Sequence, residues 1–201
     1  METFCYEKPS MHRKDDIIEY LNEFIQAHSD INGTGSLDRV LEGWTFEQAL
    51  HRTLSMENKE YALKAGRCPG KTFLLIRGND NRLIGTLNLR WDLNEAMLRF
   101  GGHIGYGIRP SERGKGYNKI NLYLGLKEAR KIGLAKVMLG CAAANIPSDR
   151  TIRALGGSLA RCETDPEDGE QTNVYWIDTA YALEKYRNVY DRYCIPAARD
   201  L

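Results

Sequence analysis

Two glycines alternate with two cations in the segment 113–118, which reads Arg-Gly-Lys-Gly-Tyr-Asn. Glycine has no Cβ, so the backbone N–H groups around Gly114 and Gly116 can approach a ligand closely. The next segment, 117–132, places leucines four residues apart and is followed by a glycine, which predicts a helix. A helix N-terminus offers unpaired N–H donors and the positive end of the helix dipole. With the two cations beside it, this arrangement is typical of a phosphate-binding loop.

Two common phosphate-binding motifs do not fit the segment. A Walker A loop needs a glycine five residues before Gly114 and Ser or Thr after the lysine, but this chain has Arg109 and Gly116 there. A dinucleotide-binding motif that starts at Gly105 needs its third glycine at the position of Pro110. We therefore expect neither a P-loop nor a Rossmann site.

Hydrophobic periodicity predicts the elements that must position this loop. Helices are expected at 10–28, 45–54, 117–132, 148–155 and 178–193. Strands are expected at 72–77, 83–91, 102–108, 136–141, 158–163 and 172–177. Residues 57–70 are polar and end in a Cys-Pro-Gly turn, so they are expected to form a loop. This order predicts an α/β (α+β) fold with a central mixed, mostly antiparallel sheet and helices on both faces.

Composition and charge exclude several classes of protein. The chain has 201 residues, and 28 Lys and Arg against 27 Asp and Glu give a net charge of +1, so no nucleic-acid partner is expected. The N-terminus lacks the apolar region of a secretory signal, and the uncharged stretch 137–147 is too short to cross a membrane. The cysteines form no Cys-x-x-Cys pair and the histidines are scattered, so no disulfide framework or metal site is expected. We expect a cytoplasmic protein with one domain over 1–201, in which 1–70 are an N-terminal helical segment and 71–177 hold the core sheet and the site.

The loop resembles the pyrophosphate loop of the GNAT superfamily of acyl-CoA-dependent N-acyltransferases. That loop has the pattern Arg/Gln-x-x-Gly-x-Gly/Ala between a strand and a helix, and residues 113–118 follow it up to the last position. Its context also matches: Gly-Gly-His-Ile-Gly-Tyr-Gly-Ile-Arg-Pro precedes it at 101–110, and Asn-Ile-Pro-Ser at 145–148 and a later Gly-Gly pair follow it. The element order over 71–177 is similar to that of the superfamily. The residues of 101–113 look like those of a bacterial branch of predicted acetyltransferases.

The resemblance implies a splayed pair of strands that admits acetyl-CoA as the cosubstrate. The strand before the loop would pair with the pantetheine arm through the backbone of Tyr106, Gly107 and Ile108. Asn145 would hydrogen-bond the arm near the thiol, with Ser148 of the same motif in that site, although an asparagine there can equally cap a helix. The loop would bind pyrophosphate through Arg113, Gly114, Lys115, Gly116, Tyr117 and Asn118.

Two departures from the family pattern affect the expected chemistry. Asn118 stands where the loop has Gly or Ala, so its side chain must turn away from the phosphate or contact it. The family's common general acid is a tyrosine seven residues after the motif asparagine, and this chain has Ile152 there. Tyr175 or a water molecule would then protonate the leaving thiolate.

His103 is the candidate general base. Many family members have a glutamate on the strand before the loop, and the equivalent position here is His103. An imidazole with an unperturbed pKa of about 6.5 can accept a proton from the amine near neutral pH. The alternatives are a strand histidine satisfied by the backbone or facing solvent. Glu112 is a poorer candidate because we expect it to point toward solvent, and Cys141 is expected to be a small buried side chain rather than a nucleophile.

The resemblance implies acetyl transfer to a primary amine by direct attack, with a small-molecule acceptor preferred over a protein. The alternative is a non-catalytic module that binds or senses acyl-CoA, which the isoleucine at 152 suggests. Candidate walls of the acceptor pocket, each of which could instead be core, are Trp44, Phe46, Trp91 and Trp176. Acidic residues that could attract an amine, or could be solvated turn charges, are Asp165, Glu167, Asp168 and Glu170. The apolar C-terminal helix either packs on its own sheet or, by a slight preference, forms a homodimer interface.

Overall fold

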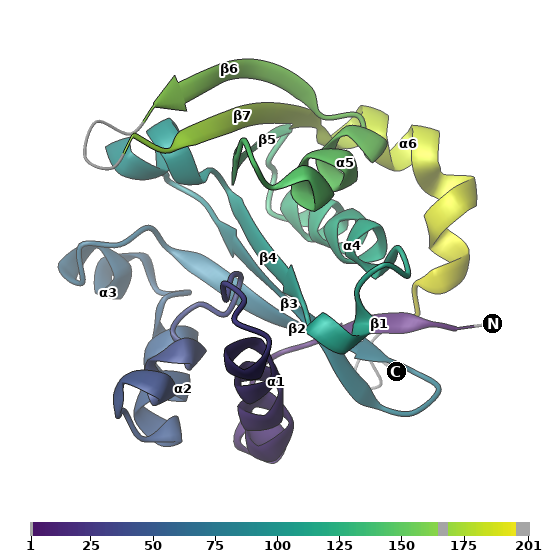
Figure 1. Cartoon of the computed structure of the whole chain (residues 1–201). Helices are drawn as coiled ribbons and strands as arrows, with labels where there is room; N and C mark the ends of the chain where they lie inside the picture. Colours follow the sequence, from purple (N-terminus) through teal and green to yellow (C-terminus); the bar gives the residue numbers. More distant parts are fainter. Residues whose placement is uncertain (1, 165–168, 196–201) are drawn as a thin grey trace.

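The computed structural model describes residues 2–164 and 169–195 (Figure 1). Its strands are β1 (Phe4–Glu7), β2 (Gly70–Arg77), β3 (Arg82–Arg90), β4 (Ile104–Ile108), β5 (Lys136–Ala142), β6 (Ser158–Thr164) and β7 (Gln171–Asp178). Its α-helices are α1 (Lys14–Gln26), α2 (Phe46–Ser55), α3 (Lys59–Lys64), α4 (Tyr117–Lys131), α5 (Ile146–Ala154) and α6 (Thr179–Tyr190). The expected fold class is confirmed.

The strands form two antiparallel sheets instead of one continuous sheet. The first has the order β1-β2-β3-β4 and the second the order β5-β7-β6. Helices α1 and α2 cover one face of the first sheet, and α4 packs between the two sheets on the other face (Figure 1). Alternate strand residues point to opposite sides, so one set packs against α1 and α2 and the other against α4.

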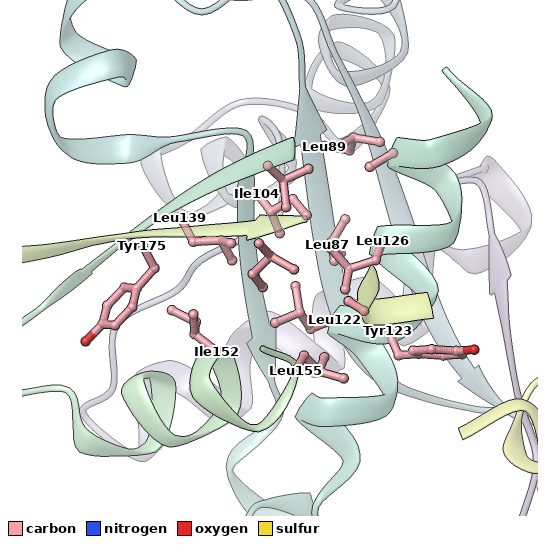
Figure 2. Packing of buried hydrophobic residues seen from close by; sticks show 14 of the residues in the cluster. Leu87, Leu89, Ile104, Leu122, Tyr123, Leu126, Leu139, Ile152, Leu155 and Tyr175 are labelled. Carbon is pink, nitrogen blue, oxygen red and sulfur yellow. The ribbon is translucent and has the colours of Figure 1, made fainter. Parts of the chain in front are cut away.

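The largest apolar cluster joins α4 to both sheets (Figure 2). Leu87 and Leu89 of β3, Leu122 and Leu126 of α4 and Leu139 of β5 all belong to it. A second cluster joins α1 and α2 to β2 and β3, so the N-terminal segment shares the core of the sheet.

The structure contains two elements that the sequence did not predict. The segment 1–70, expected to be helical, begins with β1, which pairs with β2 in the register Phe4↔Arg77. Within the expected loop 57–70, α3 forms because the Asn58 side chain caps its N-terminus by accepting the Tyr61 N–H over 2.9 Å. Both elements are short, so neither contains enough residues to show a clear period.

β4 and β5 are neighbouring edges of the two sheets, and they meet at one end only. There an isolated bridge pairs Gly102 with Leu139, and the His103 N–H donates to the Met138 carbonyl over 2.8 Å. Gly102 has φ +73°, and a Cβ at this position would overlap the Met138 carbonyl, so the contact requires glycine. Past this bridge, no backbone hydrogen bond joins β4 to β5 in the described residues. The two strands therefore splay, as expected.

Helix α6 packs mainly on its own chain. Ala182 is fully buried, and Leu183, Tyr186 and Tyr190 pack against the main cluster beside α4. The C-terminal helix therefore follows the first of the two expected arrangements for most of its apolar face.

We expect Tyr181→Glu to leave the molar mass in solution unchanged. Tyr181 is 56% exposed, and one side chain covers far less than the roughly 800 Å² that a standard interface buries on each partner. Size-exclusion chromatography with light scattering on the wild type and the variant measures this directly. A mass that halves in the variant would identify α6 as a homodimer interface after all.

Candidate active site

The loop between β4 and α4 presents a run of unpaired backbone donors. In the described residues, the N–H groups of residues 114–118 donate to no acceptor, and the first donor of α4 with a partner is Lys119, which donates to the Gly116 carbonyl over 3.1 Å. Gly114 and Gly116 adopt φ +79° and +82°, and a Cβ at either position would meet nothing within 4 Å. The loop is therefore an open cradle at the positive end of α4, which fits a phosphate group.

Both cations of the loop are held by protein groups. The Arg113 guanidinium donates to the Ile108 carbonyl over 3.2 Å and to the Ser29 hydroxyl over 2.8 Å. The Lys115 ammonium donates to Glu112 over 2.7 Å. Phosphate binding at this loop would thus depend first on the backbone donors.

Glu112 differs from the sequence-based expectation that it points toward solvent. Its side chain is buried and accepts hydrogen bonds from Arg77, Arg82 and Lys115. Burial alone would raise the pKa of Glu112, but Lys115 and Arg77 outweigh it and lower that pKa. Three cations compensate the cost of burying this carboxylate, so Glu112 fixes the base of the loop.

Asn118 and Tyr117 occupy the first turn of α4. The Tyr117 ring is buried and its hydroxyl donates to Glu2 over 2.6 Å, which anchors the start of the helix. The Asn118 side-chain oxygen is buried and has no hydrogen-bond partner in the described part of the chain. A buried acceptor without a donor is costly, so this atom lies where a bound group with a donor would stabilise it.

One edge of β4 faces away from β3, and on it only the Ile108 carbonyl has a hydrogen-bond donor in the described residues, the Arg113 guanidinium. The Arg90 N–H donates to the His103 carbonyl over 2.7 Å at one end of the β3–β4 ladder, and Arg109 donates to Ile84 at the other. Hydrogen-bonded pairs alternate along an antiparallel ladder, so Gly107, opposite Thr86, turns its N–H and C=O toward β3. Tyr106 and Ile108 turn theirs to the opposite edge, toward the gap.

The N-terminus of α5 lies across this gap from β4. The Asn145 side chain caps the helix by accepting the Ser148 N–H over 3.1 Å, so the capping alternative holds for its oxygen. The Ser148 hydroxyl is 2.9 Å from the Tyr106 hydroxyl. Burial raises the pKa of the Cys141 thiol beside them, which keeps it protonated and agrees with a structural role.

Tyr175 reaches the same first turn of α5 from β7. Its hydroxyl donates to the Asp149 carboxylate, and burial together with that carboxylate raises the pKa of Tyr175 to about 12. Ile152 is fully buried and lies beside the Tyr175 ring (Figure 2). Two tyrosine hydroxyls therefore end on successive residues of α5, the helix that also contains Ile152.

The His103 ring is tied to the backbone of β5. Its Nδ1 accepts the Met138 N–H over 2.9 Å, so the neutral ring carries its proton on Nε2. Burial, followed by the charge of Arg90, lowers the pKa of His103. This geometry disfavours the expected role as general base, because the only ring nitrogen with a lone pair already accepts a hydrogen bond.

The aromatic side chains that were candidates for the acceptor wall have different surroundings. Phe46 is buried in the core under α2, so it is not a wall, and Trp44 is exposed beside α2. The ring of Trp176 lies edge-on to His103 with centroids 6.1 Å apart, which places it at the gap. Of the acidic turn, Asp165, Glu167 and Asp168 lie outside the described residues.

Sequence reasoning missed two side chains at this gap. It treated Tyr106 as a backbone contact only, and it did not single out Arg90, whose guanidinium lies beside Gly105. No local pattern marks either residue, because the hydroxyl of Tyr106 and the burial of Arg90 depend on distant segments.

The described residues give no sign of a metal centre or a membrane span. They contain no cluster of three or more His, Cys, Asp or Glu side chains arranged to hold a metal ion. None of their helices combines the length and apolar character needed to cross a membrane.

Comparisons with known proteins give a consistent picture. The model of the acetyltransferase (GNAT) family matches residues 37–156, and no curated protein matches the chain. The structure is similar to a mutant form of the spermidine/spermine N-acetyltransferase SpeG from Vibrio cholerae, with a TM-score of 0.62 and 14% identity over 91% of this chain and 98% of that one. It is also similar to the ribosomal L7/L12 α-N-protein acetyltransferase RimL in complex with coenzyme A, with a TM-score of 0.60 and 16% identity over 86% and 92% of the two chains. A GNAT-family acetyltransferase from Bordetella pertussis gives a TM-score of 0.60 and 17% identity over 86% and 93%.

Proposed function

The chain belongs to the acetyltransferase (GNAT) family, and from this premise we propose that it transfers the acetyl group of acetyl-CoA to a primary amine of a small molecule. The observation that carries the proposal is the run of unpaired N–H groups at residues 114–118, next to the free edge of β4. A phosphate cradle and a polar strand edge, placed end to end, match a ligand that has a pyrophosphate at one end and an amide-containing arm at the other.

We assign the pyrophosphate to the backbone of residues 114–118, with Arg113 and Lys115 adding charge at the rim. The pantetheine amides pair with Tyr106 and Ile108, and the alternation of β4 removes Gly107 from that set. The Asn145 amide and Ser148 lie at the far side of the gap and contact the arm near its thiol. Bound acetyl-CoA supplies the thioester carbonyl that the amine attacks.

We assign the proton donor for the departing sulfur to Tyr106 rather than Tyr175. The Tyr175 hydroxyl donates to Asp149, so its proton is directed at a carboxylate and its ionised form would face a negative charge. The Tyr106 hydroxyl pairs with the Ser148 hydroxyl, and in such a pair either group can donate. The alternative of a non-catalytic sensing module was based on Ile152, which cannot donate a proton. Because tyrosine hydroxyls lie nearby, the isoleucine no longer favours that alternative.

Release of free thiol from acetyl-CoA in the presence of a library of primary amines tests the proposal. Amine-dependent release, above the rate without amine, is the expected result. Tight CoA binding with no release for any amine would instead support the sensing module.

His103→Ala is expected to lower kcat by about tenfold or less, the scale of one lost hydrogen bond, and to leave the acid side of the pH–rate profile in place. The acid-side fall then reflects protonation of the acceptor amine, with water removing the proton. We would compare the profiles of the wild type and His103→Ala at saturating acetyl-CoA. Loss of the acid-side fall in the variant would restore His103 as the base.

A further inference from the structure

Among residues 2–164 and 169–195, Arg90 has no carboxylate partner, and it lies at the edge of the gap. Its Nε is buried and has no hydrogen-bond partner in the described residues. One terminal nitrogen donates to the Met97 sulfur over 3.2 Å, and a thioether is a weak acceptor. No ion pair of Arg90 is recorded in the described part of the chain, and Asp92, two residues away, pairs with Lys59.

The position of the Arg90 guanidinium relates it to the reacting end of the site. Arg90 lies opposite His103 in the ladder, and a Cβ on Gly105 would stand 3.2 Å from its other terminal nitrogen. The proposed pantetheine arm starts at the phosphate loop and runs along β4 back past Ile108. Because β4 advances about 3.3 Å per residue, we place the thiol end of this arm near residues 104–106. The guanidinium therefore lies beside the residue where the proposed function places the thioester.

The guanidinium also lies on the face of the first sheet that is turned away from α4. Arg90, His103, Gly105 and Gly107 share one face of the β3–β4 ladder, because paired residues and second neighbours point the same way. Gly107 on this face lies against Tyr20 of α1. The opposite face packs on α4. Gly105 places no side chain beside the guanidinium, and the backbone of Gly33 is the next group within 4 Å of its Cβ position.

We propose that the amine acceptor carries an anionic oxygen group, a carboxylate or a phosphate, and that Arg90 binds this group and thereby determines acceptor specificity. The inference rests on the proposed function and names its substrate class. A guanidinium presents parallel donors that match the two oxygens of a carboxylate or phosphate. Arg90 is half-buried, and its Nε is cut off from water with no hydrogen-bond partner in the described residues, so a ligand that neutralises the guanidinium gains from binding. A polycationic acceptor would meet like charge here.

Matched pairs of amines test the inference by kcat/KM for thiol release. The pairs are L-alanine with L-alaninamide, γ-aminobutyrate with butylamine, and phosphoethanolamine with ethanolamine, with spermidine as the cationic probe. The wild type is expected to prefer the anionic member of at least one pair by about 10- to 100-fold, the scale of a charge-assisted hydrogen-bonded pair. The carboxylate and phosphate pairs distinguish the two sources of anion. A preference for neutral amines or spermidine would overturn the inference.

Arg90→Met is expected to reduce that ratio to near one, because it removes the donors that only the anionic member of each pair can use. Arg90→Lys keeps the charge without the planar fork, so it should give an intermediate ratio. The Tm of Arg90→Met should not fall, because the substitution removes a buried Nε that has no hydrogen-bond partner in the described residues. An unchanged ratio in Arg90→Met would also overturn the inference.

Binding of N-acetylated products separates this inference from the proposed function. Isothermal titration of N-acetyl-L-alanine, N-acetyl-L-alaninamide and N-acetyl-phosphoethanolamine into CoA-loaded protein does not require turnover. Tighter binding of an anionic product than of the neutral one, with the difference lost in Arg90→Met, supports the role of Arg90. If this result is obtained but no amine is acetylated, only the proposed function fails. Equal binding of anionic and neutral products overturns the role of Arg90 even if neutral amines are acetylated.

Discussion

Gly116→Val is expected to weaken CoA binding by on the order of 100-fold or more, because a branched side chain fills the space in which a phosphate would meet the N–H groups of the loop. Gly116 has φ +82° and open space on its Cβ side, so the wild-type backbone is both unusual and accessible. Isothermal titration with CoA measures the loss.

Gly133→Val is the matched control for this variant. Gly133 lies just past the other end of α4 with φ +85°, and a Cβ there also meets nothing within 4 Å. Both variants therefore carry the same backbone strain, about 1–2 kcal/mol, and a similar fall in Tm is expected for both. If Gly133→Val loses as much CoA affinity as Gly116→Val, strain rather than a phosphate contact explains the effect.

Arg113→Ala should have a smaller effect on CoA affinity, below about tenfold, because the backbone donors remain. Its affinity should also depend less on salt, since one screened cation has been removed. An affinity loss as large as that of Gly116→Val would shift the main phosphate contact from the backbone to the side chain.

Tyr106→Phe is expected to lower kcat by about 10²–10⁴-fold, the usual contribution of a positioned general acid. Only the hydroxyl is removed, and the backbone of residue 106 keeps its free N–H and C=O, so CoA affinity should change little. Burial raises the pKa of Tyr106, so the hydroxyl is protonated at neutral pH and available as a donor. Steady-state kinetics with a good acceptor, together with CoA titration, measures both quantities.

Tyr175→Phe is the matched comparison. It removes a hydroxyl from the same first turn of α5 but one whose proton is directed at Asp149. Its kcat should therefore fall by less than about tenfold, the scale of one lost hydrogen bond. If Tyr175→Phe shows the larger fall, the proton donor is Tyr175 after all, acting with Asp149.

Local patterns in the sequence determined the loop and the elements beside it. The glycines at 114 and 116 and the helix that follows depend on neighbours within a few residues, because positive φ and helix capping are properties of short segments. The same is true of the cap that Asn145 provides for α5 and of the capping box that Thr45 forms with Gln48. These parts of the site could be predicted before any tertiary contact was known.

Only the tertiary structure decided what the polar side chains at the gap can do. The pairing of β4 with β3 determines which N–H groups of β4 are free, and a shift of one residue would reverse that assignment. The His103 ring accepts a hydrogen bond from Met138, 35 residues away. The Tyr106 hydroxyl meets the hydroxyl of Ser148, 42 residues away. Arg90 looks like an ordinary strand-end arginine in the sequence, and its significance comes from a buried Nε with no partner and from the lack of a carboxylate partner among the described residues. Such contacts join segments that are brought together only by the packing of the two sheets around α4, so no short window of sequence contains them.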